Sequence, residues 1–248
     1  MTKNRLAKYR TGIPDKEIIK IENTDKKDWK ENWTAGRSLC DFPHSFRCCI
    51  VGLVNMGKST IAKNILIQCQ LGEKPFRQLI VVHGSKYSSE YDELDPNFIL
   101  DDIPTVDELL SGGEEEESQK TLLIIDDFEM TKLSKEQLQL LSQLFRFVSS
   151  HHNISIIICY QSFFEVPTIV RKCCNIFITF KPNNLDEIVV LGKRIGLSKK
   201  QMTFIFQNYI KEKRDTLTVD LTENSPAKYR INLYSQCKTQ CRLKTYMT

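Results

Sequence analysis

The stretch from Gly52 to Thr60, GLVNMGKST, is the feature that most restricts the fold of this 248-residue chain. It fits the pattern G-x-x-x-x-G-K-[ST], in which a glycine-containing loop joins a buried strand to a helix. The flanks agree, because residues 46–51 read as a short apolar strand and residues 61–68 as a helix. Backbone N–H groups of such a loop, together with the helix N-terminus, bind phosphate oxygens. The pattern therefore predicts a strand–loop–helix unit that binds a nucleotide.

The residue types within this loop suit a nucleotide phosphate and Mg²⁺. Glycine at the first and sixth positions permits backbone conformations that a Cβ atom would resist. Lys58 is expected to neutralise the outer phosphates, and Ser59 to ligate Mg²⁺ through its hydroxyl. The expected phosphate-binding set is Gly52, Asn55, Met56, Gly57, Lys58, Ser59 and Thr60.

A second stretch, residues 121–127 (TLLIIDD), reads as an apolar strand that ends in two carboxylates. Ligands of parallel sheets bind at the carboxyl ends of the strands. Asp126 is expected to hold Mg²⁺, directly or through water, opposite Ser59. Asp127 is expected to orient or deprotonate the water that attacks the γ-phosphate. The alternative is a simple turn after a strand, but pairing with the upstream phosphate loop favours the functional interpretation.

Gln161 follows another apolar run, residues 154–159 (ISIIIC), and so is a polar residue at the carboxyl end of a predicted strand. In that place its amide can sense the γ-phosphate or position a water molecule. The simpler alternative is that Gln161 caps a loop.

The remaining patterns predict an α/β fold. Buried strands are expected at residues 78–83 and 174–180, helices at 134–148, 183–196 and 199–210, and an antiparallel strand pair at 217–221 and 229–233. Residues 84–119 read as an irregular surface segment, so one strand is expected between the phosphate loop and the Asp-Asp strand. This order describes a RecA-like P-loop NTPase core: a mostly parallel central sheet flanked by helices, with a C-terminal antiparallel strand pair.

Length, charge and residue types limit the domain organisation and the classes of protein that the sequence allows. We expect a polar N-terminal arm (1–41), a P-loop ATPase domain (42–235) and a basic C-terminal tail (236–248). The net charge of +4 permits contact with nucleic acid without arguing for it. No apolar run approaches the length of a membrane span, and the N-terminus lacks the pattern of a secretion signal. Nine cysteines without metal-ligand spacing are expected to be reduced thiols.

Residues 144–181 narrow the class further, because they carry three short motifs in a characteristic order. An H-x-N-I-S segment (151–155) leads into a strand that ends in Gln161-Ser162, and a V-P-x-x-x-R segment (166–171) follows. In this the chain resembles the FtsK/HerA superfamily, and within it the genome-packaging ATPases of poxviruses and related large DNA viruses, virophages and Polinton-like elements. The late segment from Val219 to Asn232 also looks like the C-terminal hairpin of that family. The resemblance covers roughly residues 42–233.

The resemblance implies an ATP-driven homo-oligomeric ring that moves double-stranded DNA into a preformed capsid. The expected partners are double-stranded DNA, other copies of the chain, and capsid vertex or portal proteins, in the host-cell cytoplasm or the virion. ATP and Mg²⁺ are the implied ligands, held by Lys58, Ser59 and Asp126. Asp127 would activate water and Gln161 would sense the γ-phosphate.

The chain departs from the family pattern at three places. Asn55-Met56 stands where relatives often carry small residues, and Val170 replaces the usual Ile. Ser149-Ser150 precede the H-x-N-I-S segment where many relatives have an Arg. The arginine finger is therefore open between Arg146 and Arg171, with Arg171 preferred. The alternative for Arg171 is an ion pair with a surface carboxylate such as Glu165.

Two other functions share the phosphate loop. A nucleoside or nucleotide kinase usually needs an arginine-rich lid, whereas residues 163–182 carry Arg171 and Lys172 without a cluster. A non-catalytic nucleotide-binding scaffold is the second alternative. The presence of Lys58, Ser59 and both aspartates, each chemically competent, argues against it.

Overall fold

The computed structural model describes residues 42–70, 76–84, 89–110, 120–222, 225, 227–233 and 235–236. The predicted arm, and the predicted tail apart from Gln236, lie outside these residues. Within them one sheet is formed by β1 (Arg47–Val51), β2 (Gln78–His83), β3 (Phe98–Leu100), β4 (Thr121–Asp126), β5 (Ile154–Tyr160), β6 (Ile176–Phe180), β7 (Thr216–Asp220), β8 (Tyr229–Ile231) and β9 (Ser235–Gln236). The helices are α2 (Lys58–Gln70), α3 (Val106–Leu110), α4 (Lys135–Gln143), α5 (Ser149–His151), α6 (Thr168–Cys173), α7 (Leu185–Ile195) and α8 (Lys199–Asn208).

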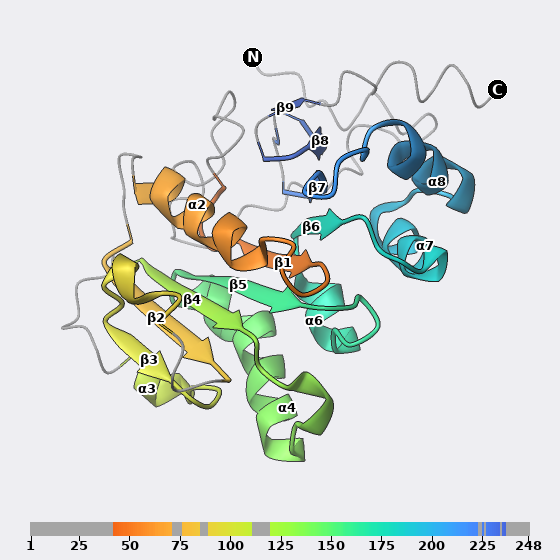
Figure 1. Ribbon diagram of the computed structural model, residues 1–248. Coiled ribbons are helices and arrows are strands. Elements are labelled where there is room, and N and C mark those ends of the chain that lie inside the picture. Colours follow the sequence, from red (N-terminus) through yellow and green to blue (C-terminus); the bar gives the residue numbers. More distant parts are fainter. Residues whose placement is uncertain are drawn as a thin grey trace, which may run out of the picture. The chain divides into compact units, whose positions relative to one another are not determined.

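The sheet confirms the predicted fold class. Its strand order is β3-β2-β4-β5-β1-β6-β7-β8-β9 (Figure 1). The strands from β3 through β6 pair in parallel, and β7, β8 and β9 continue the sheet with antiparallel pairing. The predicted C-terminal antiparallel pair corresponds to β7 and β8. No helix in the described part of the chain is long and apolar enough to cross a membrane.

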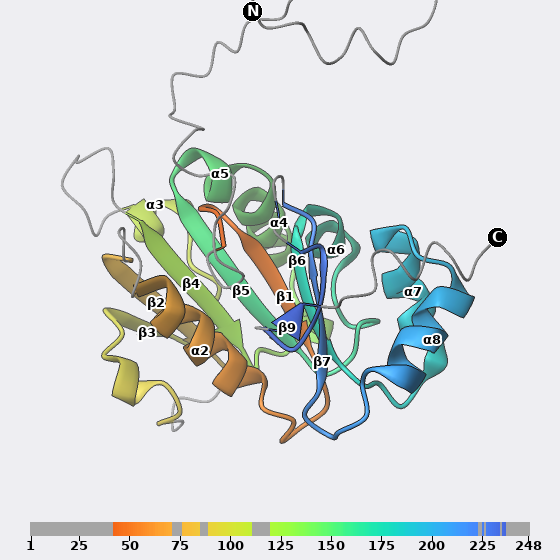
Figure 2. The same cartoon turned by 90° about the horizontal axis from the view of Figure 1, so that it is seen from above.

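Two apolar layers cover the two faces of the sheet. In β5, Ile156 and Ile158 belong to one buried cluster, and Ile157 and Cys159 to the other, because successive side chains of a strand point to opposite faces. Helix α2 covers one face, whereas α4 and α6 cover the other (Figures 1 and 2). The side chains of α7 and α8 join the cluster of α4 and α6. The strands are apolar on both sides because both faces are covered.

The helix predicted at residues 134–148 is present but not uniform. Ser134 caps α4 in the predicted capping box with Gln137. A π-helical turn, η5 (Leu144–Val148), follows, and α5 ends the run. The Nη1 atom of Arg47 donates a hydrogen bond to the Phe145 carbonyl oxygen at 3.0 Å, so an arginine of β1 binds backbone within this turn.

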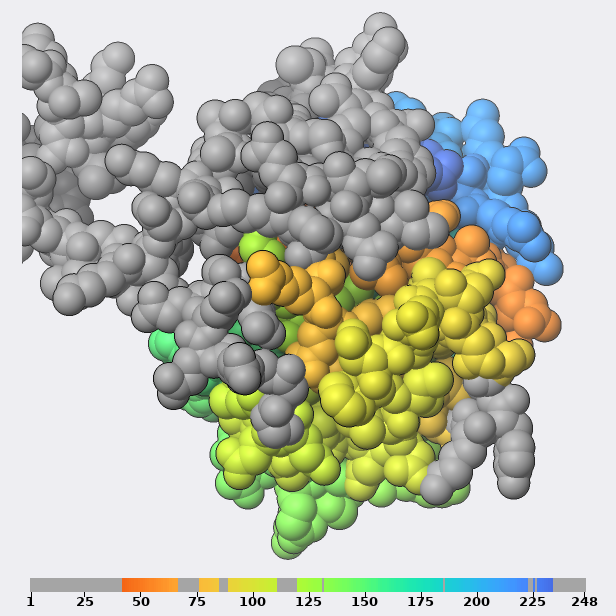
Figure 3. Space-filling model, turned by 90° about the vertical axis from the view of Figure 1, so that its left-hand side faces the viewer, coloured from red at the N-terminus to blue at the C-terminus, as the bar shows by residue number. Residues whose placement is uncertain are grey.

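The expectation of one strand between the phosphate loop and the Asp-Asp strand was wrong, because both β2 and β3 lie there. β3 has only three residues at the edge of the sheet, and Phe98 and Ile99 are about half exposed. A strand this short shows no usable periodicity in a sequence. Two further short elements, η3 (Asp92–Leu94) and α3, flank it. Figure 3 shows this segment, in yellow, at the surface of the β3 edge.

The C-terminal hairpin contains a fully buried ion pair. Arg230 of β8 contacts Asp220 of β7 at 3.1 Å, and both side chains are 0% exposed. The backbone N–H and the hydroxyl of Thr222 donate to Asp220 Oδ1, and the Arg230 guanidinium lies over the Phe42 ring. A buried charge of this kind needs a partner and hydrogen bonds to be tolerated.

Candidate nucleotide-binding site

The register of three neighbouring strands brings the predicted site residues to one edge of the sheet. β5 lies between β4 and β1, with Ile125 opposite Ile158 and Val51 opposite Tyr160. The three strands are parallel and end at nearly the same level. The phosphate loop, the two aspartates and Gln161 therefore leave the sheet side by side, where α/β folds bind ligands.

The loop after β1 has the backbone geometry that the motif requires. The Gly52 N–H donates to the Tyr160 carbonyl oxygen at 3.0 Å, and a Cβ atom at Gly52 would lie 2.4 Å from the Phe180 ring. Asn55 and Gly57 have φ angles of 61° and 103°, in the left-handed region that Asn tolerates and Gly prefers.

Lys58 and Ser59 stand in the first turn of α2. The Nζ atom of Lys58 donates to the Leu53 carbonyl oxygen within the loop at 3.1 Å. The side chain of Met56 is buried in the apolar layer beneath α2. This burial explains how the loop accommodates a bulky side chain at this position.

The two adjacent aspartates have different surroundings. Asp126 is 3% exposed, and its Oδ1 atom accepts a hydrogen bond from the Asp127 N–H at 2.9 Å. Asp127 is exposed and has a φ angle of 49°, so the chain turns sharply out of β4 at this residue. One carboxylate is thus fixed within the protein, and the other is free to meet solvent or a ligand.

Tyr91 is a residue of this site that sequence reasoning missed. It precedes η3, is 2% exposed, and its hydroxyl donates to Asp126 Oδ2 at 2.6 Å. Burial raises the pKa of Tyr91 well above its usual value. The irregular segment before β3 therefore supplies a side chain that contacts Asp126, one of the two residues predicted to hold Mg²⁺.

A cavity of about 330 Å³ opens beside Lys58, within the size range of small-molecule sites. Its lining comprises Lys58, Asp127, Phe128, Glu129, Met130, Cys159, Tyr160, Gln161 and Glu165. The structure thus brings Lys58, Asp127 and Gln161 together, as predicted. Glu129 and Glu165 are further carboxylates of this lining, and no motif in their loops predicted a place for either at the nucleotide site.

The two candidate arginine fingers lie outside the lining of this cavity. Arg171 stands in the last turn of α6, where its Nη2 atom donates to Thr168 Oγ1 at 3.1 Å and its guanidinium lies over the Phe163 ring. The sequence alternative, an ion pair between Arg171 and Glu165, is not formed between these two described residues. Arg146 is exposed in the π-helical turn η5.

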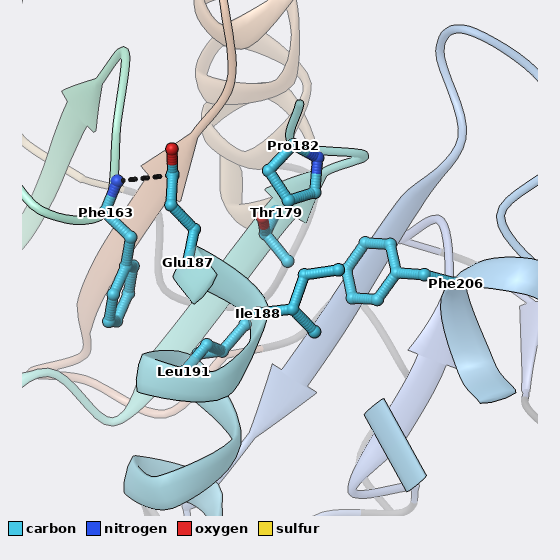
Figure 4. Close-up of a pocket in the computed structure, with 7 residues that line it drawn as sticks. All are labelled: Phe163, Thr179, Pro182, Glu187, Ile188, Leu191 and Phe206. Carbon is cyan, nitrogen blue, oxygen red and sulfur yellow. Dashed lines mark hydrogen bonds between the residues drawn. The ribbon is translucent and has the colours of Figure 1, made fainter. Parts of the chain in front are cut away.

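A second, much smaller pocket lies between β6 and the helices α7 and α8 (Figure 4). Its volume of about 10 Å³ leaves room for roughly one water molecule. At its rim Glu187 of α7 accepts a hydrogen bond from the Phe163 N–H at 2.9 Å. This contact links α7 to the loop that begins with Gln161.

The fold is found in solved structures. The genome-packaging NTPase B204 of Sulfolobus turreted icosahedral virus 2, in complex with AMPPCP, superimposes with a TM-score of 0.54 at 20% sequence identity, over 75% of this chain and 96% of that chain. The same protein with sulfate gives a TM-score of 0.55 at 18% identity, over 79% and 98%. The chain has the fold of a viral genome-packaging NTPase. B204 of Sulfolobus turreted icosahedral virus, described as a DNA-packaging ATPase, matches with a TM-score of 0.51 at 20% identity, over 74% and 95%.

Comparison of the amino-acid sequence with known proteins gives no match. Neither a protein-family model nor a curated protein matches the chain. At identities of 18–20% the likeness concerns the fold. It confirms the P-loop NTPase architecture that the sequence predicted.

Proposed function

We propose that this protein is an Mg²⁺-dependent ATPase of the FtsK/HerA type that drives viral double-stranded DNA into a capsid. The proposal is supported above all by the meeting of Lys58, Asp127 and Gln161 around one cavity. Ser59 follows Lys58 in α2, and Asp126 precedes Asp127 at the end of β4. The fold shared with viral packaging NTPases, one of them complexed with an ATP analogue, supports the choice of ATP and of DNA. The motif order in residues 144–181 supports the same class.

In this proposal the phosphate loop and Lys58 bind the ATP phosphates. The ammonium group now donates to the Leu53 carbonyl oxygen, and it would exchange this contact for phosphate oxygens. The other residues of the set, Gly52, Asn55, Met56, Gly57 and Thr60, would contribute through loop conformation and backbone N–H groups. Charge-assisted hydrogen bonds to phosphate are stronger than neutral ones.

Ser59 and Asp126 would hold Mg²⁺, since a hydroxyl and a carboxylate are oxygen ligands of the kind this ion prefers. Ser59 lies in the first turn of α2, and Asp126 ends β4 with its Oδ2 atom bonded to the Tyr91 hydroxyl. When bound, Mg²⁺ would neutralise charge on the phosphates during transfer.

Asp127 would accept the proton of the attacking water, because its carboxylate is exposed and lines the cavity. Gln161, at the end of the strand between β1 and β4, would orient that water or contact the γ-phosphate. Glu129 and Glu165 line the same cavity, and they are the rival proton acceptors to test beside Asp127.

The motor would act as a homo-oligomeric ring with residues 42–235 as the ATPase domain. Arg171, which is partly buried in the last turn of α6, would supply its guanidinium to the nucleotide of a neighbouring copy, and Arg146 is the alternative. Double-stranded DNA and capsid vertex or portal proteins are the proposed partners, and the host-cell cytoplasm or the virion is the proposed location.

An ATPase assay with and without double-stranded DNA tests the proposal against both alternatives. A motor should hydrolyse ATP and respond to DNA, and Lys58→Ala should abolish the signal. A nucleotide kinase would instead transfer labelled phosphate to a nucleoside or nucleotide acceptor. A scaffold would bind ATP without turnover, and either result would refute the motor.

A further inference from the structure

Tyr91 is held firmly although it belongs to a segment with little regular structure. Its ring lies edge-on to His83, with centroids 6.4 Å apart, and Lys63 of α2 lies over the ring at 5.7 Å. Lys63 also forms an ion pair with Glu93, in the short helix η3 that follows Tyr91. The ring is therefore clamped between the end of β2 and the helix that begins at the phosphate loop.

The Tyr91 hydroxyl completes the support of the Asp126 carboxylate. Oδ1 accepts from the Asp127 N–H and Oδ2 accepts from the Tyr91 hydroxyl, so hydrogen bonds hold both oxygens. Each carboxylate oxygen has about two lone-pair sites, so one oxygen can accept a hydrogen bond and also face a cation. Rotation of this carboxylate would break at least one of the two bonds.

We propose that Tyr91 is a positioning residue that orients the Asp126 carboxylate toward Mg²⁺. This inference rests on the proposed function, because it assumes that Asp126 holds the metal. Hydrogen-bonding partners of metal ligands are worth 10–100-fold in metal affinity. Tyr91 acts through other residues and needs no contact with the nucleotide.

The test is Tyr91→Phe in the full-length chain, which removes one oxygen atom and retains the ring. Mn²⁺ serves as the probe, and its binding in the presence of ATPγS is measured by electron paramagnetic resonance. The expected result is an affinity for Mn²⁺ weaker by about 10–100-fold, with ATPγS binding in EDTA unchanged. Tyr229→Phe is the matched control, since its hydroxyl bonds the Ile195 carbonyl oxygen and it does not line the cavity.

Asp126→Asn and the double variant separate this inference from the proposed function. If Tyr91 acts through Asp126, Tyr91→Phe should weaken Mn²⁺ binding much less in the Asp126→Asn background, whereas independent effects would add. Unchanged or tighter Mn²⁺ binding in Tyr91→Phe would overturn the inference, even if the melting temperature falls. Normal Mn²⁺ binding in Asp126→Asn would instead overturn the proposed metal site itself.

Discussion

Gly84 offers a way to move the Asp127 turn without changing any residue of the site. It follows β2, in which His83 lies opposite Asp126. A Cβ atom at Gly84 would stand 2.3 Å from the Asp127 carbonyl oxygen, whereas ordinary contact begins at 3.4 Å. Relief through the turn requires a shift of about 1 Å, and a misplacement of that size can cost about 100-fold in rate. The left-handed φ of Asp127 leaves this turn little freedom to adjust otherwise.

We therefore expect Gly84→Ala to lower kcat about 100-fold while ATP affinity stays close to that of the wild type. Affinity is retained because the phosphate loop lies between β1 and α2, and Lys58 begins α2, away from the added atom. Single-turnover hydrolysis of γ-labelled ATP measures the first quantity, and titration with a fluorescent ATP analogue measures the second.

Gly192→Ala is the matched control, because its Cβ atom would stand 2.7 Å from the Leu197 carbonyl oxygen, in the turn between α7 and α8. It should lower the melting temperature without a comparable loss of kcat. A folded Gly84→Ala protein with near-normal kcat would refute the reasoning. In that case the end of β2 would shift to relieve the contact, and the Asp127 turn would stay in place.

The other variants test the individual roles. Lys58→Ala removes a charge-assisted phosphate contact, so the free energy of ATP binding should weaken by about 1.5–3 kcal/mol and phosphate release should stop. Near-normal turnover would exclude the phosphate-loop assignment. Asp127→Asn should bind Mg-ATP without hydrolysing it, because an amide accepts no proton. Asp126→Asn should instead weaken Mg²⁺ dependence and binding together. Swapped phenotypes in the same two assays would reverse these roles. Arg171→Ala and Lys58→Ala should each be inactive alone, and mixing the two proteins should partly restore ATPase activity. In mixed rings some interfaces join an intact phosphate loop to an intact arginine finger, and such a finger is worth on the order of 10³–10⁵ in rate. Without recovery in mixed rings verified by mass, Arg146 becomes the candidate.

The parts of the site that follow from local sequence were predictable. The phosphate loop, the strand ending in Asp126 and Asp127, and the strand before Gln161 each combine an apolar run with polar residues at its end. In a parallel sheet such ends lie together, and the observed register brings them to one edge. The capping box at Ser134 was readable for the same reason, because its two partners are three residues apart.

The parts that depend on long-range packing were not predictable. Tyr91 lies 35 residues before Asp126 and meets it only because the chain folds back before β3. β3 itself has three residues and an exposed outer side, so it lacks the apolar pattern of the central strands. Gly84 matters because the Asp127 backbone passes close to it, and no pattern in either segment indicates that approach.

The buried pair of Asp220 and Arg230 limits where the chain can be shortened. A protein that ends before β8 would retain every residue of the nucleotide site, yet it would leave Asp220 inside the sheet without its guanidinium. Removing one partner of a buried pair costs about 3–5 kcal/mol, a large share of the roughly 5–15 kcal/mol that keeps a domain folded. A shortened chain should therefore extend through Arg230 to keep this share of its stability, well beyond the last residue proposed to act on ATP.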